Sequence, residues 1–117
     1  MTEETKTILK RYEKEYEAEE DKSSKENDTK LLKMFYWGGA SSTMGIIADF
    51  EYETDYIRKL LNTDIKAMKI IKKSLEQMKK IDKEHYFTAE LERRQSETAG
   101  KIMAYSVALA TITKEVL

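Results

Sequence analysis

The chain has 117 residues, a length that fits one small domain and excludes a two-domain enzyme with a cleft between its domains. Hydrophobic residues make up 40% of the chain and charged residues 37%, with no proline, which favours long solvated helices over a turn-rich β-sandwich or barrel. The formal net charge of -1 argues against general nucleic-acid binding. We therefore expect one all-α domain over residues 1–117: a small bundle of three to five helices with a long C-terminal helix and antiparallel packing.

The chain contains no cysteine, so disulfides, thiol nucleophiles and thiolate metal sites are excluded. The first residues are polar and no apolar run follows them, which argues against a cleaved secretory signal. The least charged window, residues 34–48, is shorter than the roughly 20 apolar residues that span a bilayer. We expect a cytoplasmic protein without membrane insertion, and export without a signal peptide stays open.

An N-terminal segment, residues 1–22, opens the chain and is expected to hold a short amphipathic helix from about Glu3 to Asp21. Its apolar positions recur at helical spacing and are Ile8, Leu9, Tyr12 and Tyr16. Residues 23–30 contain no apolar side chain, so we expect a polar linker there, with a turn at Ser23 and Ser24. Residues 31–117 then form the main helical bundle.

Apolar residues continue at helical spacing from Leu31 to Lys83, as one helix or two, with a possible break at Asn62-Thr63-Asp64. The apolar stripe there includes Phe50. Seven lysines are expected on the side of the helix away from the stripe: Lys66, Lys69, Lys72, Lys73, Lys79, Lys80 and Lys83. A solvated face is favoured over a site for an anionic membrane, nucleic acid or an acidic partner.

The last segment has the clearest helical pattern, from Phe87 almost to Leu117, and Arg94 is the one charged residue in its apolar stripe. Small residues beside the stripe, among them Gly100, let a second helix approach closely. The expected core comprises Ile57, Leu61, Met68, Ile71, Leu75, Leu91, Ile102, Tyr105, Leu109 and Ile112.

Chemistry-bearing residues do not form a recognisable constellation. His85 is the only histidine, and Asp82 is its one nearby carboxylate, which is fewer groups than a metal centre or an acid–base site needs. The segment from Gly38 to Gly45 lacks the lysine and the preceding strand of a phosphate-binding loop. We therefore expect no enzymatic activity, no metal and no cofactor.

An aromatic–glycine segment, residues 35–45, is the most distinctive feature. A turn between helices is slightly favoured over a helix whose glycines allow close backbone contact, and the aromatic residues are interpreted as core or as an interface anchor. The candidate partner-binding residues lie here and on the small-residue side of the last helix: Phe35, Tyr36, Trp37, Gly38, Gly39, Gly45, Ala104 and Ala108.

Trp37-Gly38-Gly39 has the form Trp-x-Gly and is expected between an N-terminal helical region and a long second helix. In this the chain resembles the WXG100 family of small helical hairpins. The resemblance implies a dimer that is exported by, or assists, type VII secretion. Three features differ from the family: a further long helix follows His85, no Tyr-x-x-x-Asp/Glu signal lies near the C-terminus, and the polar stretch from Glu19 to Lys30 interrupts the expected first helix.

The leading functional hypothesis is a non-enzymatic helical protein that acts through helix–helix contacts, as an adaptor, inhibitor or assembly factor. We expect a homodimer, because thin apolar stripes on long helices bury little surface within one short chain. The expected partner is a protein of unknown identity and not nucleic acid. The alternatives are the WXG100-like secretion role and a self-assembling structural protein.

Overall fold

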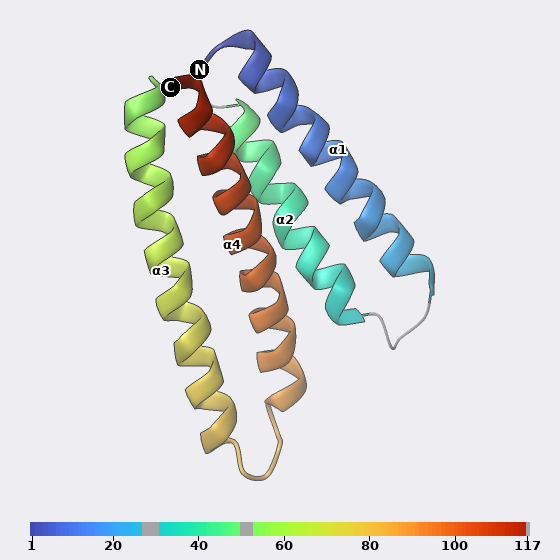
Figure 1. Cartoon of the computed structure of the whole chain (residues 1–117). Coiled ribbons are helices and arrows are strands. Elements are labelled where there is room, and N and C mark those ends of the chain that lie inside the picture. Colours follow the sequence, from blue (N-terminus) through green and yellow to red (C-terminus); the bar gives the residue numbers. More distant parts are fainter. Residues whose placement is uncertain (27–30, 50–52, 117) are drawn as a thin grey trace.

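The computed structural model describes residues 1–26, 31–49 and 53–116, which form four α-helices and no strand (Figure 1). The helices are α1 (Glu3–Glu26), α2 (Leu31–Asp49), α3 (Thr54–Ile81) and α4 (Thr88–Val116). The prediction of a small all-α bundle is therefore confirmed.

The helices lie side by side in the order α1, α2, α4, α3, so that α1 and α3 form the two edges (Figure 1). Within the described residues, the backbone of α3 lies close to that of α4 and not to those of α1 and α2. The α1–α2 and α3–α4 pairs are antiparallel hairpins, as expected, but the central helices α2 and α4 run parallel. This arrangement is an elongated layer, with principal extents of 50 × 31 × 18 Å.

Two glycines bring the backbones of α2 and α4 together. A Cβ atom on Gly39 would collide with the carbonyl oxygen of Glu97, and one on Gly100 with the carbonyl oxygen of Tyr36. Residues 38–45 are helical, so the favoured prediction of a turn is wrong. Close packing against α4 offsets the low helix propensity of glycine, which costs about 1 kcal/mol per residue.

The core lies mainly between α1, α2 and α4, where α3 adds Ile57 and Leu61. The largest fully buried side chains are Leu9, Met44, Ile47, Ile57 and Ile112. Of the predicted core residues, Ile57, Leu61, Leu75 and Ile112 are buried, and Met68, Leu91, Ile102, Tyr105 and Leu109 are half-buried. Ile71 is exposed, so its assignment to the core is wrong: α3 has a single neighbouring helix, which covers only part of its apolar arc.

The helix boundaries differ from the sequence prediction in two places. Helix α1 continues to Glu26, so the turn expected at Ser23 and Ser24 is wrong, and Ser23 is buried. Residues 27–30 of the expected linker, and Phe50 of the expected stripe, lie outside the described residues. Within the expected range 31–83, the described helices are α2 and α3, and Asn62-Thr63-Asp64 lies inside α3 and not at a break.

Glu115 joins the ends of three helices where the two chain termini meet (Figure 1). Its carboxylate accepts hydrogen bonds from the Thr2 amide before α1 and from the Thr54 hydroxyl at the start of α3, the latter at 2.6 Å. Desolvation alone would raise the pKa of Glu115, but these hydrogen bonds lower it below its ordinary value. This ionised carboxylate therefore stabilises the end of the layer.

Candidate interaction surface

The aromatic half of the predicted partner-binding segment packs against α1. The Trp37 ring lies 5.4 Å from the Tyr16 ring and 5.0 Å from the Tyr36 ring, measured between centroids. Tyr16 is buried, and its burial, followed by the nearby Tyr12, Glu15 and Tyr36, raises its pKa to about 12. These rings therefore act first as the packing between α1 and α2.

The small residues of the predicted site also have contacts within the chain. Gly39, Ala104 and Ala108 are buried, and the two α4 alanines belong to the core. Gly38 and Gly45 lie opposite the carboxylates of Glu20 and Glu13 on α1. Tyr36 and Phe35 are half-buried. The fold thus brings the eight predicted residues to two internal seams, α1–α2 and α2–α4, rather than to one open surface.

A different apolar surface is open to solvent. Of the nine large hydrophobic side chains that are exposed in the described part of the chain, seven lie on α3 or in the turn after it. Four of them lie within a sector of about 100° on one flank of α3, which we call the α3 strip: Tyr56, Ile70, Ile71 and Met78. An edge helix with a second apolar flank is a typical site for a further helix.

A pocket of about 140 Å³ lies beside the α3 strip. It is formed by α2, α3 and α4, and its apolar wall includes Ile46, Leu60 and Tyr105, with Asp64 at its polar side. Burial, and then the Asp64 carboxylate, raises the pKa of Tyr105. Because Leu60 lies in the same sector of α3 as the strip, the pocket extends this apolar surface toward α2.

Around the axis of α3, the side that faces α4 comes first, the α3 strip next, and a row of exposed lysines after the strip. These lysines occupy a sector of about 80° and are Lys59, Lys66, Lys69, Lys73 and Lys80. The expectation that all seven lysines point away from the packed side is wrong for Lys79, whose ammonium lies 3.3 Å from Gln95 and 3.9 Å from Glu92 on α4. Lys72 and Lys79 line a shallow pocket together with Glu92 and Gln95 of α4. The remaining lysines give α3 a basic outer edge.

The turn between α3 and α4 is held by the Asp82 carboxylate. It accepts hydrogen bonds from the amides of Phe87 at 2.8 Å and Tyr86 at 3.1 Å, and from the Thr88 hydroxyl at 2.9 Å. His85 has a positive φ of 60°, and its Nδ1 lies 3.1 Å from the Thr88 hydroxyl. His85 and Asp82 thus belong to a structured turn.

Sequence reasoning identified the lysines but missed the α3 strip. The available signal was the width of the apolar arc on α3, since Ile70 lies about 140° from Ile57 around the helix axis. A single neighbouring helix covers roughly a 100° stripe, so one of these residues had to remain outside the packed side.

No three His, Asp or Glu side chains converge as metal ligands within residues 1–26, 31–49 and 53–116. Comparisons of the chain with protein-family models, curated proteins and solved structures return no match. Trp37, Gly38 and Gly39 lie inside α2, which differs from the position between helices on which the WXG100 resemblance rests. Among the described helices, none combines the length and apolar character needed to cross a bilayer.

Proposed function

We propose that this protein is a non-enzymatic helical binding module, an adaptor, inhibitor or assembly factor, that associates with a second copy of itself through the α3 strip. The supporting observation is the concentration of exposed apolar side chains on one edge helix. Solvent exposure of Ile70 and Met78 is unfavourable, and a partner helix that covers them gains hydrophobic free energy.

The accessible surface of the chain is large enough to supply a standard protein–protein interface. The chain exposes 7766 Å², whereas a compact monomer of 13.7 kDa exposes about 6,600 Å². The excess of about 1,200 Å² exceeds the roughly 800 Å² that each partner buries in a standard interface. The radius of gyration, 15.6 Å, is likewise larger than the roughly 13 Å of a compact chain of this length. Contact with a second copy would remove part of this excess surface from water.

The experiment is light scattering coupled to size exclusion over a wide micromolar range. We expect a mass of about 27 kDa, twice the chain mass, and a shift to about 14 kDa in the double variant Ile70→Glu/Met78→Glu, which places two charges on the strip. The matched control is Ala18→Glu on the exposed side of α1. A wild-type mass of about 14 kDa at every concentration would contradict dimerisation, and a mass that grows without limit would favour the self-assembling structural alternative.

A further inference from the structure

The α3–α4 turn projects beyond the ends of α1 and α2 (Figure 1). It carries three of the most exposed hydrophobic side chains in the described part of the chain: Ile81 (77%), Tyr86 (76%) and Phe87 (66%). We call these three residues the hairpin tip. They lie at the narrow end of an elongated molecule, so they form a convex knob and not a groove or a flat face.

The hairpin tip is held in its exposed conformation. Both aromatic residues donate their backbone amides to Asp82, which fixes the chain direction while leaving the rings in solvent. The hairpin therefore does not need the Tyr86 and Phe87 side chains for its own hydrogen bonding. The two rings are therefore held in solvent, where they can contact an apolar surface of another body.

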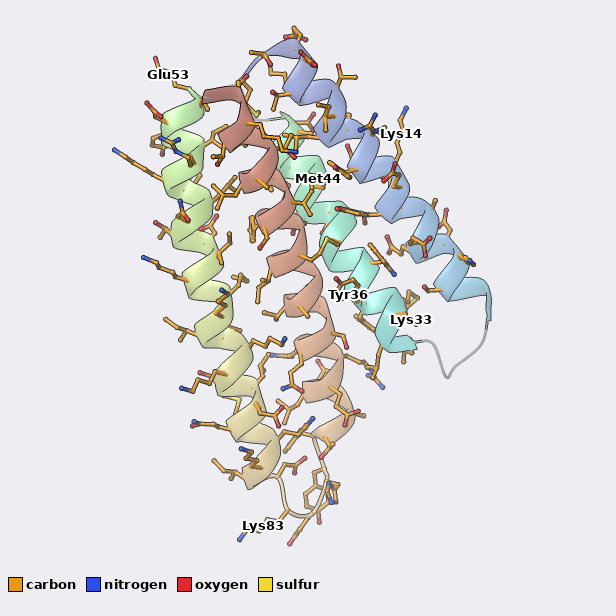
Figure 2. The ribbon with its side chains drawn as sticks, viewed as in Figure 1. Lys14, Lys33, Tyr36, Met44, Glu53 and Lys83 are labelled. Carbon is orange, nitrogen blue, oxygen red and sulfur yellow. The ribbon has the colours of Figure 1, made fainter. Side chains whose placement is uncertain are left out.

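The outer side of α3 that leads to the hairpin tip is basic. Residues 66–87 contain seven lysines against Glu76, Asp82 and Glu84. In the hairpin itself, residues 79–90, three lysines are balanced by Asp82, Glu84 and Glu90. Within the described residues, neither Lys80 nor Lys83 forms an ion pair, whereas Lys79 is taken up by Glu76 and Glu92. Figure 2 shows Lys83 at the end of the hairpin, directed away from the helices. Two lysines without an ion pair in the described part of the chain thus flank the apolar hairpin tip on its α3 side.

We propose that the hairpin tip docks on an anionic lipid surface, with Ile81, Tyr86 and Phe87 in the headgroup boundary and Lys80 and Lys83 against the lipid phosphates. Aromatic side chains favour this boundary because their rings can lie against the acyl chains while a polar group, such as the tyrosine hydroxyl, stays in water. Long lysine side chains keep their ammonium groups at the headgroups while their stems lie along apolar surface. An exposed apolar tip with Lys80 and Lys83 beside it suits a deformable lipid surface better than a preformed protein pocket.

The test is sedimentation of the full-length protein with vesicles of phosphatidylcholine alone, or with about one-third phosphatidylserine, at physiological salt. We expect binding to the anionic vesicles to be at least about tenfold stronger than to the neutral ones, because each lysine near an anionic surface contributes to binding. Tyr86→Ser/Phe87→Ser is expected to abolish binding, and Lys80→Gln/Lys83→Gln to weaken it about tenfold or more.

The control variants are Ile46→Ser, which removes an apolar side chain on α2 that is 61% exposed, and Lys14→Gln/Lys22→Gln on α1. Both are expected to bind as the wild type does. Equal binding to the two vesicle types, retained binding by the aromatic double variant, or no binding at all would overturn the proposal. Light scattering on the same protein preparations without vesicles reports dimerisation separately, so a failure of lipid docking is distinguishable from a failure of the proposed self-association.

Discussion

Individual glycines in this protein differ in what they contact, although all four lie in helices. A methyl group on Gly100 would meet the backbone of α2, which cannot move without separating the two central helices. A methyl group on Gly38 would lie 3.1 Å from the end of the Glu20 side chain, which can rotate away.

We expect Gly100→Ala to lower the free energy of unfolding by about 3 kcal/mol or more, as severe overpacking does. The matched variant Gly38→Ala is expected to leave this free energy within about 1 kcal/mol of the wild type, because improved helix propensity opposes any small clash. Urea unfolding followed by circular dichroism measures both. Similar values for the two variants would contradict the close contact of α2 and α4.

The raised pKa of Tyr16 predicts that the free energy of unfolding falls at alkaline pH. Its pKa is raised to about 12 in the folded protein, above the ordinary value of about 10 in the unfolded chain. The folded state therefore holds this proton more tightly, so the contribution is complete below pH 10 and is lost as the pH rises toward 12. The full effect is about 2–3 kcal/mol.

The measurement is the free energy of unfolding between pH 9 and 12 for the wild type and for Tyr16→Phe. Since the many lysines also titrate in this range, only the difference between the two proteins reports Tyr16. The difference is expected to change in favour of the variant as the pH rises. A difference that is independent of pH would show that Tyr16 ionises as freely in the folded state as in the unfolded one.

At the scale of elements, the α3–α4 hairpin depends on one carboxylate that bridges the end of one helix and the start of the next. Desolvation opposes ionisation of Asp82, but the hydrogen bonds from Phe87, Thr88 and Tyr86 together lower its pKa below the ordinary value. Because the folded-state pKa is depressed, this stabilisation is present above the ordinary carboxyl pKa and is lost as the pH falls through the folded value.

We expect Asp82→Asn to destabilise the protein at neutral pH and to reduce the loss of stability on acidification below about pH 4. Unfolding curves for the wild type and the variant between pH 2 and 7 measure the effect, and the comparison removes contributions from Glu115 and other carboxylates. Parallel pH profiles for the two proteins would exclude this role for Asp82.

At the scale of the whole molecule, the proposed pairing of α3 strips predicts that thermal stability depends on protein concentration. If two copies cover each other's α3 strips, dimerisation is linked to folding, and the Tm rises with concentration. We expect this rise in the wild type and in Ala18→Glu, and a constant Tm in Ile70→Glu/Met78→Glu. Scanning calorimetry over a hundredfold range of concentration makes the comparison, and a constant wild-type Tm would count against the dimer.

The sequence was sufficient to predict the helices but not which helices pack against one another. The periodic apolar positions on α4, such as Ile112, predicted both a long helix and its buried side. The same reasoning misplaced Ile71, because α3 carries more apolar surface than its single neighbour covers. The sequence assigned Trp37 and Gly39 to a partner-binding surface, which stays a prediction; within the chain they pack against α1 and α4.

The sequence by itself determined the all-α class, the absence of cysteine chemistry and the basic character of α3, because composition and the 3.6-residue period are local properties of the chain. Only the tertiary structure decided that α2 and α4 are the central pair, that residues 38–45 are helical, and that α3 is an edge with an open apolar flank. The physical reason is that these outcomes depend on contacts between residues far apart in sequence, such as Tyr36 with Gly100, whose steric fit no local pattern encodes.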